Sequence, residues 1–418
     1  MLEKSEYVTD RETTKAEAHW LNRERLTLYP GIFLAGYLVS CIGAAILKNM
    51  YDLQGIPFGA DFIQFWAASH LALTGHAQDA YNSSLLLKTE QLVTPAFKAR
   101  YIWLYPPSFY LVVLPLALLP YLAAYWTFML STLGGYLLVL RRLVRGKTAM
   151  WCLAGFSGLW VNLYCGQNGF LTAAIAGAAL FSVERRPVLA GALIGLLAIK
   201  PHLAILFPVV LLAIGAWRTL ITAAVTAITF MAIGTLTLGT AVLKAFFANL
   251  GHARLSLENG YLLWKKMPSV FAFLRLLEMP VTWAYVVHCI VAAVAVIAVW
   301  QVWRHCQNWN LRGAALMTAT FLVSPYAYDY DLAWLAFPIA WLTLDGVRNG
   351  WLRGEREALV AAWLMPLLMS PIAGALKFQP GPLVLCSLLW ITVRRANAAS
   401  MMDDMAADAY ADQFEPVP

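Results

Sequence analysis

The stretch that decides the fold class is residues 28–47, which read LYPGIFLAGYLVSCIGAAIL. It contains no charged side chain, and a run of about 20 apolar residues is long enough for a helix to cross the hydrocarbon core of a bilayer. Lys48 follows directly and ends the run. We therefore expect a membrane-spanning helix here. The polar segment 1–27 before it lacks the layout of a signal peptide and is expected to be a cytoplasmic tail.

The composition of the whole chain indicates the same class. Of its 418 residues, 61% are hydrophobic and 13% are charged, whereas soluble domains have about 25% charged residues. The sequence therefore predicts an all-α polytopic membrane protein with about 10–13 transmembrane helices. Because Pro106 and Pro107 cannot lie inside a helix, the run 108–119 is expected to form a short or re-entrant helix. Further spans are expected near 121–140, 150–165, 168–183, 187–199, 202–216, 218–240, 282–303, 311–325, 331–346, 357–373 and 379–393.

The net charge of +7 could indicate a nucleic-acid partner, but the basic side chains form short clusters between the apolar runs. Such clusters mark the cytoplasmic ends of transmembrane helices, so we expect no nucleic acid and two cytoplasmic termini. The six cysteines are scattered without a CxxC pair or a metal-ligand spacing, so neither a metal site nor a redox motif is expected. The basic clusters are Arg23/Arg25, Arg141/Arg142/Arg145/Lys147, Arg185/Arg186, Arg304/Arg312, Arg348/Arg353/Arg356 and Arg394/Arg395.

Polar or Gly/Pro-rich segments fall on the opposite, extracytoplasmic side in this arrangement. The first large one is the loop 49–101, in which the interrupted apolar run 62–73 predicts an interfacial helix and 84–100 a second helix. The acidic C-terminal tail, 396–418, is expected to be disordered. The other outer segments are 165–169, 200–202, 241–280 and 324–331.

Asp61 is a carboxylate placed just beyond the first predicted span, in Gly59-Ala60-Asp61-Phe62-Ile63-Gln64. With Gln64 three residues later, it fits a capping box that satisfies the first amides of a helix. A carboxylate at the boundary of lipid and water also fits a general base that takes a proton from a hydroxyl group. The two interpretations are compatible, and both stay open at this point.

Lys200 lies between two apolar runs and is followed by Pro201 and His202. A cation in such a setting is costly unless it reaches the interface or binds a partner. One interpretation is a side chain that extends to the interface. The other is a ligand for a lipid phosphate, with Pro201 opening the helix so that Lys200 and His202 face a cavity.

The late outer segment contains Tyr328, Asp329 and Asp331, which suit either a solvated helix cap or the recognition of sugar hydroxyl groups. Gln167 and Asn168 suit either a turn or the same sugar contacts. The chain has no Walker loop, no HExxH and no GxSxG motif. A lipid-linked donor therefore fits the sequence better than a cytosolic nucleotide.

Several short motifs follow one another in an order that resembles a known family. The chain is similar to the polyprenol-phosphate-mannose-dependent mannosyltransferases of glycosyltransferase family 87, which belong to the GT-C class of multi-spanning transferases. The resemblance covers roughly residues 30–345. It rests on Gly59-Ala60-Asp61-Phe62, Tyr81, Tyr105-Pro106-Pro107, Pro115, Leu119-Pro120-Tyr121, Gly166-Gln167-Asn168, Ala190-Gly191, Lys200-Pro201 and Ser324-Pro325-Tyr326.

The resemblance implies a GT-C transmembrane domain over residues 28–395 and an inverting transfer of a hexose, with mannose the first candidate, from a polyprenyl-phosphate donor. It implies Asp61 as the general base acting on the hydroxyl of an extracytoplasmic glycolipid or glycan acceptor, without metal or cofactor. The setting that the resemblance implies is a bacterial inner membrane with the active site on the periplasmic side. Lys200 is the first candidate for the donor phosphate, followed by His202, Lys265 and Lys266. Sugar or acceptor contacts are expected from Gln64, Tyr105, Gln167, Asn168, Tyr328, Asp329 and Asp331.

The late loop departs from the family, because some members carry histidines where this chain has Tyr328-Asp329-Tyr330-Asp331. This leaves the donor sugar and the acceptor open. A non-enzymatic flippase or transporter of lipid-linked sugars is the alternative from another class, and a polymerase or ligase of surface polysaccharide is a third. Transporters usually need ionisable groups deep within their spans, whereas here such groups, apart from Lys200, lie near span ends.

Overall fold

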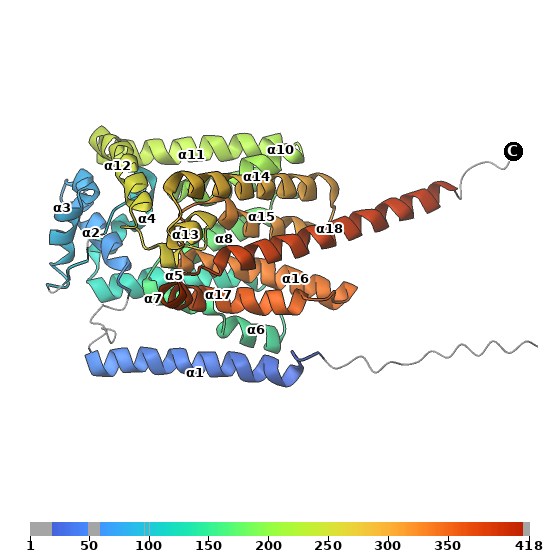
Figure 1. Ribbon diagram of the computed structural model, residues 1–418. Helices are drawn as coiled ribbons and strands as arrows, with labels where there is room; N and C mark the ends of the chain where they lie inside the picture. The colour runs from blue at the N-terminus through green and yellow to red at the C-terminus, as the bar shows by residue number, and fades with distance from the viewer. Residues whose placement is uncertain (1–18, 49–58, 96, 100, 413–418) are drawn as a thin grey trace, which may run out of the picture.

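The computed structural model describes residues 19–48, 59–95, 97–99 and 101–412, and these residues form helices and connecting loops without a β-strand. Long helices run side by side along one axis (Figure 1). By length and composition, five of the described helices can cross a membrane. The prediction of an all-α polytopic membrane protein is confirmed. The five are α1 (Arg23–Lys48), α5 (Tyr121–Leu140), α11 (Trp217–Leu238), α14 (Val281–His305) and α17 (Glu355–Leu376).

The other predicted spans correspond to shorter or interrupted helices, except 379–393, most of which lies in the 32-residue helix α18. Residues 150–165 are divided at Gly155 and Phe156, and the break at Lys200 separates two single 3-10 turns, η3 and η4. The number of crossings therefore stays a prediction. The segments are α6 (Lys147–Ala154), α7 (Ser157–Cys165), α8 (Gly169–Leu180), α9 (Pro187–Leu196), η3 (Leu197–Ile199), η4 (Pro201–Leu203), α10 (Leu206–Ala213), α15 (Trp309–Val323), η6 (Asp329–Leu335), α16 (Ala336–Asn349) and α18 (Gly381–Asp412).

Helices α9 and α11 pack closely because α9 carries glycines four residues apart. A Cβ atom on Gly191 would lie 2.5 Å from the carbonyl oxygen of Thr219, and one on Gly195 would lie 2.5 Å from Cβ of Thr226. Small residues at this spacing let two helix backbones approach each other in lipid. This packing fixes α9 against α11, and Lys200 follows α9 and η3 at one end of the bundle.

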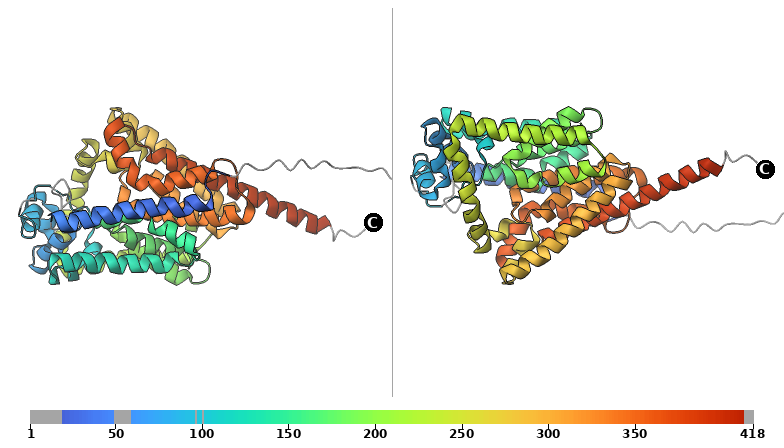
Figure 2. Two further views of the ribbon diagram at one scale, coloured as in Figure 1. Left: turned by 90° about the horizontal axis from the view of Figure 1, so that it is seen from below. Right: turned by 90° about the horizontal axis from the view of Figure 1, so that it is seen from above.

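Shorter elements gather at that end of the bundle. Helices α2 (Phe62–Leu73), α3 (Ser83–Glu90) and α12 (Thr240–Glu258) lie there (Figure 1), and α12 runs across the direction of the long helices (Figure 2). The predicted short helix at 108–119 is confirmed as α4 (Pro107–Val113) and η2 (Leu114–Leu118). The remaining short elements are η1 (Ala77–Tyr81), η5 (Trp264–Lys266) and α13 (Val270–Leu276).

One expectation for the first loop needs correction, and the other stays a prediction. Most side chains of α2 from Phe62 to Ser69 are buried against neighbouring protein segments, and its position in the membrane interface stays a prediction. The second predicted helix, 84–100, is the shorter α3, which ends at Glu90. The buried face of α2 is covered by η1, η2, α3 and α4.

The beginning of α1 and the C-terminal part of α18 lie at the opposite end of the bundle from α2 and α12 (Figure 1). There Arg395 of α18 forms ion pairs with Asp345 of α16 and Glu355 of α17, which joins three helices. The expected disorder of the C-terminal tail is wrong up to Asp412, because α18 continues to that residue. Its alanines and methionines are strong helix formers, and their propensity outweighs the acidic charge. Residues 413–418 lie outside the described part of the chain.

Candidate active site

The outer segments singled out in the sequence surround one cavity of about 600 Å³. Its walls come from the first loop, the turn after α7, the break between η3 and η4, helix α12 and the segment that follows α15. This volume is in the range of small-molecule binding sites. The polar residues along its wall are Asp61, Gln64, Tyr101, Tyr105, Gln167, Lys200, His202, Arg254, Tyr261, Lys266, Tyr285, Tyr326, Tyr328 and Tyr330.

The main chain positions Asp61 against the end of α7. The amide of Gly59 donates to the carbonyl of Tyr164 at 2.9 Å, and the amide of Asp61 donates to the carbonyl of Cys165 at 3.1 Å. The last carbonyls of a helix have no partner within the helix, so the first loop satisfies two of them. Gly166 ends α7 at φ +73°, and a Cβ atom there would lie 2.7 Å from Cβ of Phe62. The two segments can approach this closely because Gly166 has no side chain.

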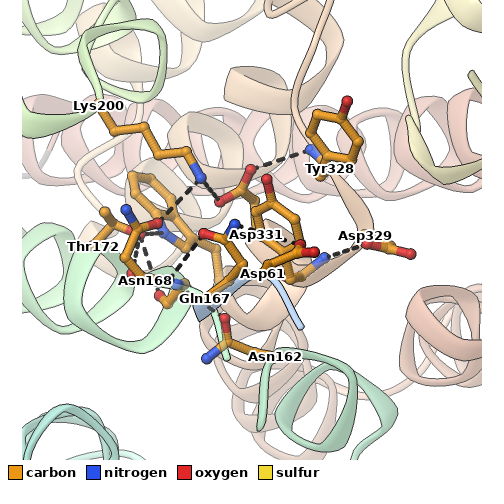
Figure 3. A network of polar contacts seen from close by, with 12 residues as sticks. Asp61, Asn162, Gln167, Asn168, Thr172, Lys200, Tyr328, Asp329 and Asp331 are labelled. Carbon is orange, nitrogen blue, oxygen red and sulfur yellow. Dashed lines mark hydrogen bonds and ion pairs between the residues drawn. The ribbon is translucent and has the colours of Figure 1, made fainter. Parts of the chain in front are cut away.

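The Asp61 side chain does not cap α2, so the capping-box interpretation is wrong. Its backbone is already helical, with φ −75° and ψ −20°, and no capping hydrogen bond forms. The carboxylate instead accepts the Tyr101 hydroxyl at 3.0 Å and the Gln167 amide nitrogen at 3.4 Å. Figure 3 shows Asp61 and Gln167 facing each other. Gln64 is buried on α2 and contributes to the cavity wall.

Gln167 is itself held by a buried tyrosine. The Tyr105 hydroxyl donates to the Gln167 side-chain oxygen at 2.9 Å, which leaves the amide nitrogen of Gln167 directed toward Asp61. The Tyr105 ring stacks on Phe109 with 4.3 Å between centroids. Burial raises the pKa of Tyr101 above its ordinary value, as does the nearby Asp61 carboxylate, so this hydroxyl stays a proton donor. Tyr105 and Gln167, expected as sugar contacts, therefore belong to the surroundings of Asp61.

Lys200 is neutralised by a buried carboxylate. Its Nζ atom lies 2.6 Å from Oδ1 of Asp331 and 3.1 Å from Oδ1 of Asn168, as Figure 3 shows. The ammonium group also lies 4.7 Å from the centroid of the Tyr330 ring. Asp331 is fully buried, and its Oδ2 accepts the amide of Tyr328 at 3.1 Å. Lys200 does not extend to an interface, and Asp331 is not a solvated cap.

Asp329 points away from this pair and does not belong to the cavity wall. It is 4% exposed and accepts the amide of Tyr330 at 2.9 Å. Burial raises the pKa of Asp329 from 3.8 to about 7, while the Lys266 ammonium acts in the opposite direction. The rings of Tyr328 and Tyr330 stack at 5.3 Å and present an aromatic surface to the cavity.

The two adjacent lysines of η5 are separated by the fold. Lys266 is part of the cavity wall, whereas Lys265 is exposed and lies outside it. The Cys165 side chain, followed by the carboxylates of Asp329 and Asp61, raises the pKa of Lys266 and more than offsets the effect of burial. Lys266 is therefore a charged group near Asp61. His202 also reaches the cavity, and its Nε2 atom is buried without a hydrogen-bond partner among the described residues.

The sequence model of glycosyltransferase family 87 matches residues 103–325, which is more than half of the chain. The chain belongs to glycosyltransferase family 87. No curated protein and no solved structure matches it. Family 87 membership and the apolar helices make the protein a membrane glycosyltransferase. Tyr105, Gln167, Lys200 and Lys266 lie within the matched range. Asp61, before it, rests on the geometry described above.

Three polar wall residues of this family 87 protein were not singled out from the sequence. Tyr101 lies in the irregular segment before α4, from which Ile102, Leu104 and Tyr105 also line the cavity. The other two are Tyr261 and Tyr285, for which the sequence offered no signal. Among the described residues, no group of three His, Cys, Asp or Glu side chains could hold a metal ion. Metal independence stays a prediction.

Proposed function

We propose that this family 87 glycosyltransferase moves a hexose, with mannose the first candidate, from polyprenyl phosphate to a hydroxyl of an extracytoplasmic glycolipid or glycan. The observation that carries the proposal is the environment of Asp61. Its carboxylate is free of capping contacts, accepts hydrogen bonds from Tyr101 and Gln167, and faces a cavity that also contains Lys266. A general base needs this combination of fixed orientation and access to substrate.

The chemical step is an in-line displacement at the anomeric carbon. The acceptor oxygen attacks this carbon from the side opposite the phosphate while its proton passes to the Asp61 carboxylate. The new carbon–oxygen bond forms as the bond to the phosphate oxygen breaks, and the electron pair of that bond leaves with the lipid phosphate. The configuration at the anomeric carbon is therefore inverted. Tyr101 and Gln167 hold the carboxylate so that little reorientation is needed during proton transfer.

The leaving phosphate needs a cation, and Lys266 is the preferred candidate. Lys200, the first choice from sequence, already has a carboxylate partner at 2.6 Å in Asp331. Lys266 reaches the same cavity, and no ion pair with a described carboxylate satisfies it within 4 Å. A charged ammonium there can stabilise the negative charge that develops on the phosphate. The buried imidazole of His202 can add a hydrogen bond to the donor.

The cavity wall also suits the remaining parts of both substrates. Tyr328 and Tyr330 offer stacked rings for a sugar face, and Phe246, Leu250 and Leu257 of α12 add an apolar wall suited to a lipid chain. The basic clusters near the other end of the bundle favour that end as cytoplasmic. This supports an extracytoplasmic site and two cytoplasmic termini. The resemblance to family 87 adds the proposal of a bacterial inner membrane.

The test is transfer of labelled sugar from polyprenyl-phosphate mannose to extracted lipid and glycan acceptors, with purified wild type beside Asp61→Asn. The substitution keeps the size of the side chain and removes the base, so we expect kcat to fall by about 10²- to 10⁴-fold. Thermal melting must show that the variant is folded. Equal transfer by both proteins would refute the role of Asp61. Absence of transfer by wild type, with flipping of the donor in vesicles, would favour the flippase alternative.

A further inference from the structure

A second cavity lies between helices α1, α5, α6 and α7, and none of its wall residues belongs to the candidate active site. Its volume is about 210 Å³, and every residue along its wall is apolar, including Leu34, Leu137, Met150 and Trp160. The indole nitrogen of Trp160 donates to the carbonyl of Ala154, so it offers no polar group to the cavity. An apolar cavity of this kind excludes ions and sugars and accepts hydrocarbon.

Basic side chains follow α5 and begin α6, the two helices that contribute Leu137 and Met150 to this cavity. Arg141, Arg142 and Arg145 lie in the loop between α5 and α6, and Lys147 is the first residue of α6; all four are exposed. None of them forms an ion pair with a described residue within 4 Å, and residues 141–156 contain no Asp or Glu. The loop is therefore an uncompensated cationic surface.

The spacing along the helices matches the shape of a phospholipid. Leu137 lies four residues before Arg141 on α5, and Met150 lies three residues after Lys147 on α6. At a rise of about 1.5 Å per residue, the cavity begins roughly 5–6 Å from the basic loop along the helix axis. A phosphate at the loop would therefore have its acyl chain beside the cavity.

The packing of α1 gives this cavity a structural role. Near its beginning, α1 is fixed to α6, because the Trp151 indole donates to the carbonyl of Thr27 at 2.8 Å and Gly155 lies against Pro30. Farther along, Leu38 and Val39 are exposed, and little of the helix is buried in protein. The cavity lies beside Leu34, between the fixed and the open parts of α1.

We propose that this cavity and the α5–α6 loop together form a binding site for one anionic glycerophospholipid. One acyl chain occupies the apolar cavity, and the phosphate binds Arg145, Lys147 and the neighbouring arginines. Filling the space beside Leu34 holds α1 against α5 and α6. The site lies near the end of the bundle opposite the sugar-transfer cavity, so its occupant is a structural lipid and not the donor.

The experiment uses the full chain, purified in a neutral detergent. Its thermal melt is followed with added dioleoylphosphatidylglycerol, with dioleoylphosphatidylcholine and with inorganic phosphate, and bound lipid is counted by native mass spectrometry. We expect the melting temperature to rise with phosphatidylglycerol and to change little with the other two. An equal rise with phosphatidylcholine would refute the headgroup assignment, and an equal rise with inorganic phosphate would refute the role of the acyl chain.

Matched variants test the two halves of the site separately. Arg145→Gln/Lys147→Gln should weaken phosphatidylglycerol binding by about tenfold or more, because each cation near a phosphate strengthens binding. The charge-matched control is Arg348→Gln/Arg353→Gln, which removes two exposed cations, one from the last turn of α16 and one from the loop after it, and should leave binding unchanged. Met150→Trp should fill the cavity and abolish the rise while keeping the basic loop. Unchanged binding in Arg145→Gln/Lys147→Gln would overturn the proposal even if Met150→Trp fails to fold.

Discussion

At the scale of single residues, the most informative group is the chain of contacts from Tyr105 through Gln167 to Asp61. The amide of Gln167 could rotate by half a turn if nothing distinguished its oxygen from its nitrogen. The Tyr105 hydroxyl donates to the oxygen, so the nitrogen faces the Asp61 carboxylate. Tyr105 is therefore a positioning residue that acts on the proposed base through Gln167.

Substituting Tyr105→Phe should lower kcat by about fivefold to tenfold, since it removes a hydrogen bond of about 1 kcal/mol that orients Gln167. KM should change little, because Tyr105 would act on the base and not on the bound substrate. Steady-state kinetics with saturating donor separates the two constants. The control is Tyr110→Phe, which also loses a buried hydrogen bond, to the carbonyl of Ala77, but has no contact with Asp61. An equal loss of kcat in both variants would show that Tyr105 contributes only to packing and does not position Gln167.

The pair Lys265 and Lys266 allows a direct test of the phosphate site. Lys266→Met should raise KM for the lipid-phosphate donor, or lower kcat/KM, by about tenfold to 100-fold, as expected for a hydrogen bond to a charged group. Lys265→Met removes the same charge from the neighbouring position, but that side chain is exposed and lies outside the cavity. It should therefore behave as wild type. Matching losses in both variants would indicate a general effect of surface charge, and no loss in either would exclude Lys266 as the phosphate ligand.

At the scale of elements, the Lys200–Asp331 ion pair joins the break between η3 and η4 to the beginning of η6. Both partners are buried, with side-chain exposures of 7% and 0%. Removing one charge of such a pair leaves the other unpaired in a medium that solvates it poorly. The pair is therefore a contact between distant segments, and its two members need to be tested together.

We expect Lys200→Met alone to destabilise the protein by about 3–5 kcal/mol, and Lys200→Met/Asp331→Leu to recover most of that loss. Chemical or thermal unfolding of the three proteins in detergent measures this. Sugar transfer by the double variant then separates the two roles of Lys200. A stable but inactive double variant would indicate that Lys200 binds the donor. A stable and active double variant would indicate that Lys200 has a structural role alone. An additive loss in the double variant would contradict the pairing.

The five long helices could be predicted because a run of about 20 apolar residues has few other structures available to it in a membrane protein. The break in 150–165 could not, because Gly155 is needed where α1 approaches α6 at Pro30, and that contact joins segments more than a hundred residues apart. Asp61 was found by its residue type and position. Its partner Tyr101 lies 40 residues away, and only tertiary packing brings the two together. The same holds for Asp331, which no local pattern connects to Lys200.

At the scale of the whole molecule, stability should depend on pH through Asp329. Burial raises the pKa of Asp329 from 3.8 to about 7. The folded protein therefore holds a proton that the unfolded chain releases between these values, and this contribution to stability falls as the pH rises from about 4 to about 7. Asp329→Asn imitates the protonated acid at every pH. The melting temperature of wild type, compared with that of Asp329→Asn, should fall as the pH rises from about 4 to about 7. Above pH 7 the difference between the two proteins should stay constant. A constant difference from pH 4 to pH 8 would contradict the assignment.

The way in which the first loop meets α7 also bears on how the sequence of this enzyme can vary. Gly59 and Asp61 bind the carbonyls of Tyr164 and Cys165 through amide nitrogens, which every residue except proline possesses. Replacing the side chain of Ala60 or Tyr164 leaves these bonds available. Inserting or deleting one residue shifts the main chain by about 3.5 Å, so that the amides of the first loop no longer face the carbonyls of Tyr164 and Cys165. Apart from Gly59 and Gly166, where a Cβ atom would clash with Tyr125 and Phe62, evolution can thus change the residue types of this junction far more readily than its length.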